Sequence, residues 1–154
     1  MGYSIEQVGS AFYLPAGQKA AALAAVKSMF SGAAREYLYV AREEVVAART
    51  VEAALMAWGW EAEVDRTGTC PHCGGPLPGL ATASGDIIDL IWRWDYAGDE
   101  DRLFATIAPF IAPGSWIEMR GAEGEHWRWM FDGRNVTRIF ARIIWDGETE
   151  HGST

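Results

Sequence analysis

Alternation of hydrophobic and polar positions is clearest in the second half of the chain. Side chains two residues apart share one face of an extended strand, so this pattern predicts β-structure. Asp132 and Gly133 form a pair that is typical of a tight hairpin turn between two such segments. The predicted strands cover residues 86–96, 115–120, 125–131 and 135–140. Because short turns join neighbouring strands, we expect a mainly antiparallel sheet.

Helical spacing of apolar residues dominates the first half. A strand over residues 10–14 is followed by a helix from Pro15 to about Phe30. Thr50 is suited to cap a second helix, because its hydroxyl can accept a hydrogen bond from the first helical turn. Two short segments are less regular: residues 37–40 resemble a strand, and residues 42–49 suit either a helix or a loop.

A third helix is expected within the strand-rich half. Asp99 occupies the position of its N-cap, and acidic residues follow in the first turn, where they favour the helix dipole. Its buried stripe is predicted to contain Leu103, Phe104, Ile107 and Ile111. A further short strand is predicted over residues 61–65.

The order of these elements predicts an α+β fold in which helices cover one face of the sheet. A ferredoxin-like sandwich or a relative of it fits this order best. We expect one domain over residues 1–154, because no composition shift divides the chain. Residues 67–85 form an insertion rich in Gly and Pro that carries both cysteines.

Strand parity assigns the side chains of the sheet to two faces. The helix-covered face should collect Trp92, Trp94, Ile117, Met119, Trp127, Trp129 and Phe131. The repeated Trp-Arg-Trp sequences at 92–94 and 127–129 are then best explained as core packing. The open face should present Arg93, Trp116, Glu118, Arg120, His126 and Arg128, and Arg138 follows in the next strand.

An exposed indole among guanidinium groups suggests a nucleotide-type ligand. Trp116 would stack on a base, and Arg side chains would bind phosphate through charge-assisted hydrogen bonds. The candidate ligand-binding residues are Arg93, Trp116, Arg120, His126, Arg128 and Arg138. The alternative is that Arg and Glu on this face simply pair across strands and solvate it.

The pair Cys70 and Cys73, in the sequence Cys-Pro-His-Cys-Gly-Gly, has three interpretations. It resembles half of a zinc knuckle, which would need further ligands, for example from a second subunit in a homodimer. It also resembles a thioredoxin-type redox pair, although Gly74, Gly75 and Pro76 oppose the helix that such a site requires. The third interpretation is an inert loop. Zinc is therefore the one candidate cofactor.

Charge and composition restrict the partners. The 154 residues include 21 acidic and 13 basic side chains, giving a net charge of −8. Such a chain is not attracted to nucleic acid or to anionic membranes. The sequence has no signal peptide, transmembrane stretch or known catalytic motif, so we expect a cytoplasmic protein of a bacterial cell with no catalytic residues.

Segments spread over most of the chain resemble a widespread family of small acidic proteins encoded by phages and mobile elements. The resemblance is carried by IAPFI at 107–111, GSWIEM at 114–119 and WRWMFDG at 127–133. It implies an accessory protein that counters host defence. Combined with the open face, it suggests a non-enzymatic protein that sequesters a nucleotide-derived immune signal. The alternatives are an acidic inhibitor that binds a defence protein as a nucleic-acid mimic, and a small nucleotide-processing enzyme.

Overall fold

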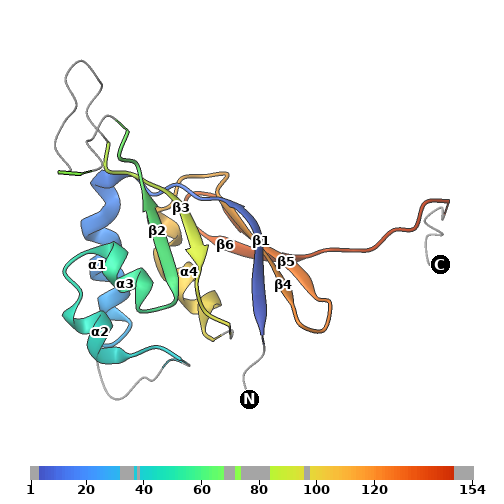
Figure 1. Cartoon of the computed structure of the whole chain (residues 1–154), viewed down its shortest axis with the longest axis horizontal. Coiled ribbons are helices and arrows are strands. Elements are labelled where there is room, and N and C mark those ends of the chain that lie inside the picture. The colour runs from blue at the N-terminus through green and yellow to red at the C-terminus, as the bar shows by residue number, and fades with distance from the viewer. Residues whose placement is uncertain are drawn as a thin grey trace.

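The computed structural model describes residues 4–31, 37, 39–67, 72–73, 84–95 and 98–147. Within them the α+β class predicted from the sequence is confirmed. The elements are β1 (Ile5–Ala11), η1 (Ala16–Gln18), α1 (Lys19–Ser28), α2 (Arg42–Ala47), α3 (Val51–Met56), β2 (Trp60–Val64), β3 (Ile87–Trp92), α4 (Glu100–Ile107), η2 (Ala108–Phe110), β4 (Trp116–Gly121), β5 (His126–Phe131) and β6 (Val136–Phe140). Figure 1 shows α1, α2 and α3 gathered beside β2 and β3.

The strands form a four-stranded antiparallel sheet in the order β1-β4-β5-β6 and a two-stranded antiparallel sheet of β2 and β3. The two sheets meet between β1 and β3. There the backbone of Leu14 pairs with that of Ile87, and the Ile5 N–H donates to the Asp95 carbonyl at 2.9 Å. The combined order β2-β3-β1-β4, with helices in the β1–β2 and β3–β4 connections, is the ferredoxin-like arrangement, which β5 and β6 extend.

A side chain completes the junction of the sheets. The Gln7 carboxamide donates to the Leu90 carbonyl and accepts from the Trp92 N–H, both at 2.8 Å. Beside it the Ser10 hydroxyl donates to the Asp89 carboxylate at 2.6 Å. Buried backbone groups need hydrogen-bond partners, so Gln7 takes the place of a rung of the β-ladder.

Both sheets share one core, and α4 contributes its centre. The predicted stripe of Leu103, Phe104, Ile107 and Ile111 is buried as expected. The Phe104 ring lies 5.2 Å from that of Trp60 in β2 and 4.8 Å from that of Trp129 in β5, measured between centroids. Edge-to-face contacts of this kind stabilise a core beyond the area they bury. Phe104 therefore ties the two sheets together.

The helix caps agree with the sequence only in part. The Thr50 hydroxyl accepts a hydrogen bond from the Ala53 N–H at 3.2 Å and caps α3, as predicted. Asp99 occupies the N-cap of α4, but its side chain makes no capping hydrogen bond. Instead the buried Glu100 carboxylate accepts from the Gly98 N–H at 2.7 Å, and burial raises the pKa of Glu100.

Four details of the sequence-based prediction were wrong. The strand predicted over 10–14 begins earlier, at Ile5, and the strand predicted over 86–96 ends at Trp92. Strict alternation over residues 86–96 would place Ile88 on the same face as Trp92, but a register shift between Glu63 and Val64 leaves Ile88 exposed. The described residues of 37–40 form a turn and not a strand. Within the ranges that the structure describes, no helix is long and apolar enough to span a membrane.

Candidate functional site

The predicted face assignment holds for β4 and β5. Ile117, Met119, Trp127, Trp129 and Phe131 are buried, whereas Trp116, Glu118, Arg120, His126 and Arg128 are half-buried or exposed on the opposite face. Trp92 is also buried, so core packing explains three of the four Trp of the two Trp-Arg-Trp sequences. The fourth, Trp94, is half-buried.

The charged groups of this open face bind one another. Arg128 Nη2 donates to Glu118 Oε2 at 2.7 Å, and His126 Nε2 lies 2.5 Å from Glu118 Oε1. Arg120 forms an ion pair with Glu6 of β1. The hydrogen bond from Arg128, followed by that from His126, lowers the pKa of Glu118. The alternative prediction of cross-strand pairs therefore describes the arrangement of these residues.

Trp116 is already covered on the open face. The guanidinium carbon of Arg128 lies 4.5 Å from the centroid of its ring, which is a cation–π contact. Its benzo edge packs on Gly9, where an added Cβ would lie 3.5 Å from the ring. The hollow beside this pair, lined by His126, Trp127 and Phe140 among others, has a volume of about 130 Å³. Sites for small molecules usually measure roughly 300–1,000 Å³, so the volume of this hollow lies well below that range.

Two predicted ligand residues lie elsewhere, which corrects the expected cluster. Arg93 follows β3 in the other sheet and forms an ion pair with Glu61 of β2. Arg138 lies on the helix-covered face of β6, where it donates to Asp101 of α4 at 2.9 Å. Asp101 also accepts from the Trp129 indole at 2.7 Å, so this carboxylate fixes Arg138 on the inner side of the sheet. Sequence parity alone could not show either pairing, because both partners are distant in sequence.

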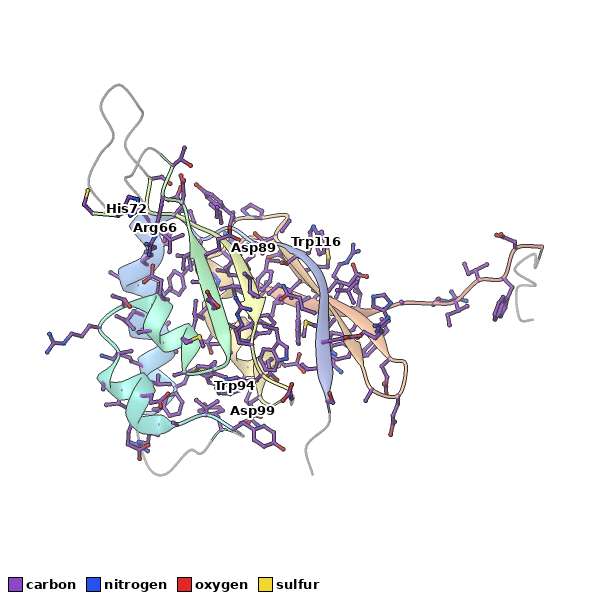
Figure 2. The ribbon with its side chains drawn as sticks, in the orientation of Figure 1. Arg66, His72, Asp89, Trp94, Asp99 and Trp116 are labelled. Atoms are coloured by element: carbon purple, nitrogen blue, oxygen red, sulfur yellow. The ribbon has the colours of Figure 1, made fainter. Side chains whose placement is uncertain are left out.

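Arg93 instead lines a larger hollow, which we call the Trp94 pocket. It is lined by Tyr39, Arg93, Trp94 and Asp95 and has a volume of about 350 Å³. The size falls within the range of small-molecule sites. Figure 2 places Trp94 at the end of the short sheet where α4 begins, near Asp99 and well away from Trp116. The pocket combines two aromatic rings, a cation and a carboxylate.

The wall of the pocket is held by the backbone. The Trp94 ring lies so close to Gly59 that a Cβ added there would come within 2.4 Å of it. Gly59 has a φ of +89°, a conformation that glycine adopts without strain. Its carbonyl accepts a hydrogen bond from the Arg93 N–H at 2.9 Å. The chain therefore presents Trp94 and its two neighbours from a fixed strand end.

Tyr39 is also part of the lining, and the sequence did not point to it. Its φ is +64°, the one positive value among the described residues other than glycine, and its side chain is 46% exposed. A bulky residue in this region of φ is unusual and costs of order 1–3 kcal/mol. Such conformations cluster at functional sites. The apolar run 37–40 had predicted a strand, so no signal indicated an outward-facing aromatic ring.

A roomier hollow of about 570 Å³ lies beside Arg102 and Tyr37. The Tyr37 side chain is buried, with Arg102 over its ring at 5.9 Å and its hydroxyl bonded to the Met29 carbonyl. This hollow therefore offers no exposed aromatic ring for a planar ligand.

The cysteine site can be described only in part. Cys73 is exposed, and Cys70 lies outside the described residues. Across the described portion of the chain, no three His, Cys, Asp or Glu side chains gather as metal ligands. The zinc half-site therefore stays a prediction. The insertion connects β2 to β3, and its base is fixed by Asp65, which accepts hydrogen bonds from Thr67 and Ser84.

No protein-family model, curated protein or solved structure significantly matches this chain.

Proposed function

We propose that this protein is a non-enzymatic binding protein that captures a nucleotide-type small molecule in the Trp94 pocket. One observation carries the proposal: Tyr39 and Trp94 line a hollow of about 350 Å³ together with Arg93 and Asp95. Stacking of a base on an aromatic side chain contributes roughly 1–3 kcal/mol. Two rings at one hollow thus supply a useful part of the binding free energy of a small ligand.

The polar groups complete the recognition of such a ligand. Asp95 would accept hydrogen bonds from ring N–H or amino groups of a base, and Arg93 would bind a phosphate through its guanidinium fork. Arg93 is paired with Glu61 in the free protein. Both side chains of this pair are 49% exposed, and exposed pairs contribute only about 0–1 kcal/mol, so a phosphate can replace Glu61 at low cost.

The biological setting is part of the proposal and comes from the resemblance to phage-encoded proteins. A protein that binds a nucleotide-derived signal without converting it would lower the free concentration of that signal in a host cell. In this proposal the four residues of the Trp94 pocket bind the base and the phosphate, and none of them takes part in a chemical step.

A nucleotide panel tests this function. Mono-, di- and cyclic nucleotides are added to the wild-type protein, its melting temperature is measured, and the recovered nucleotide is analysed by chromatography. We expect one class to raise the melting temperature with no product formed, because a ligand that binds the native state stabilises it. The Trp94→Ala variant should lose this shift, and Trp116→Ala should keep it.

The other outcomes separate the alternatives. A product would contradict the binding-protein proposal and favour the nucleotide-processing enzyme. No shift with any nucleotide would also contradict it, and would favour the acidic inhibitor that binds a defence protein.

A further inference from the structure

The segment that follows β6 concentrates exposed apolar side chains. The most exposed large apolar residues of the described chain are Ile143 at 81%, Trp145 at 69% and Ile144 at 65%, and Phe140 and Ile139 precede them at 59% and 47%. Figure 1 shows this segment running away from the sheets. Exposed apolar runs of this kind mark interaction sites.

β6 itself lies at the edge of the four-stranded sheet. Its pairing with β5 continues past its last residue, because the Ala141 N–H donates to the His126 carbonyl at 2.8 Å. Backbone N–H and C=O groups alternate in direction along a strand. Those of Arg138 and Phe140 therefore point toward the outer edge of β6. A strand edge with these groups and apolar side chains is a template for pairing with another strand.

We propose that two copies of this chain associate by antiparallel pairing of residues 136–146, with the two-fold axis at Ala141. In this register Ile139 of one copy lies opposite Ile143 of the other, and Thr137 lies opposite Trp145. Phe140 lies opposite Arg142. Pairs of β-branched and aromatic residues are the ones that stabilise antiparallel strands, and Arg beside an aromatic ring adds a cation–π contact.

Three features favour a second copy as the partner. Within the described residues, the outer edge of β6 pairs with no strand, and residues 141–146 form an extended apolar segment that belongs to no sheet. Two-fold pairing brings the edge of each copy together with the segment of the other. The Ala141 N–H is bonded to β5, so the chain is still part of the β6 pairing at Ala141 and does not turn back on its own edge there. Residues 135–145 contain no Asp or Glu, and Asp146 lies only at the end of the paired stretch, so two chains of net charge −8 meet here without acidic side chains along most of the interface.

Sedimentation equilibrium of the full chain tests the association. We expect wild-type protein at twice the chain mass of 16.9 kDa. Ile143→Asp should give a monomer, because the pairing would bury its carboxylate. Val46→Asp is the matched control, since Val46 is 51% exposed on α2, and it should remain a dimer. A monomeric wild type, or a dimer that survives Ile143→Asp, would overturn the proposal.

Cross-linking tests the register. Ala141 would face its own copy across the axis as a non-hydrogen-bonded pair, with Cα atoms about 4.5 Å apart, which suits a disulfide. In a Cys70→Ser, Cys73→Ser background, Ala141→Cys should form a disulfide-linked dimer on mild oxidation. Val8→Cys, at an exposed position of β1, should not form such a dimer. A dimer linked equally well at both positions, or at neither, would contradict the proposed pairing.

Discussion

The side-chain oxygen of Gln7 accepts a hydrogen bond from the backbone N–H of Trp92 at 2.8 Å. Its amide nitrogen donates to the Leu90 carbonyl at the same distance. The Gln7 side chain thus supplies hydrogen bonds of the β-ladder where β1 and β3 meet. The junction matters for function because Trp92 leads directly into Arg93 and Trp94, which line the proposed site.

Replacing Gln7 by Leu should destabilise the fold by roughly 2 kcal/mol, because two part-buried backbone groups would lose their partners. Gln7→Glu keeps the acceptor for Trp92 but places an oxygen against the Leu90 carbonyl, so it should also destabilise the fold. Urea denaturation measures both changes. Gln18→Ala is the control, since Gln18 is exposed and its side chain makes no capping hydrogen bond. Equal stability of Gln7→Leu and Gln18→Ala would refute this role.

Gly59→Ala should disrupt the Trp94 pocket. The new Cβ would lie 2.4 Å from the Trp94 ring, and a side chain is strained at a φ of +89°. Gly114 has nearly the same φ, +88°, but no atom within 4 Å of an added Cβ. Gly114→Ala therefore reports the backbone strain alone, about 1–2 kcal/mol. We expect Gly59→Ala to lower the free energy of unfolding by clearly more, and to abolish nucleotide binding.

Equal losses from the two glycine variants would mean that the Trp94 ring moves freely out of the way. That result would contradict a pocket wall fixed by Gly59.

Protonation of Asp65 should weaken the base of the cysteine-bearing insertion. Hydrogen bonds from Thr67 and Ser84 lower the pKa of Asp65 to about 2, from an ordinary value of 3.8. A lowered pKa in the folded state stabilises the fold above the ordinary value, and this contribution is lost as the pH falls from about 4 to 2. Unfolding curves of Asp65→Asn should therefore depend less on pH in this window than those of the wild type. If the stabilities of the wild type and Asp65→Asn changed equally with pH in this window, the role given to Asp65 would be disproved.

The open face of β4 and β5 should be structural. Trp116→Ala combined with Arg128→Ala removes the cation–π pair and one partner of Glu118, which should cost about 2 kcal/mol of stability from the lost burial of the indole. Nucleotide affinity, measured by calorimetry, should stay within a factor of two. A tenfold loss of affinity would instead restore the open face as the ligand site.

Local pattern predicted most of the helices and strands, and it predicted the faces of β4 and β5. Alternation over Trp116 to Phe131 placed the buried and exposed side chains correctly, because two pairing strands on one core leave no other register. The same reasoning failed at Ile88, where a register shift reverses the alternation. No composition signal marks such a shift.

Contacts between distant segments could not be predicted from spacing. Strand parity grouped Arg93 with Trp116, and Arg138 was added because it follows in the next strand, but Glu61 and Asp101 hold these two arginines on other surfaces. Tyr39 was missed because residues 37–40 resemble a strand, and nothing in the sequence indicates the positive φ of Tyr39. The candidate site therefore depends on the end of β3, Gly59 and Tyr39, which are distant in the sequence.

The most direct test of ligand capture in the Trp94 pocket uses the eight tryptophans as reporters. Two-dimensional ¹⁵N–¹H spectra resolve each indole N–H, and single Trp→Phe variants assign the signals of Trp94 and Trp116. On titration with the nucleotide class that stabilises the protein, the Trp94 indole should shift most and Trp116 should stay unchanged. A dominant shift of Trp116, or no indole shift at saturating nucleotide, would contradict the account.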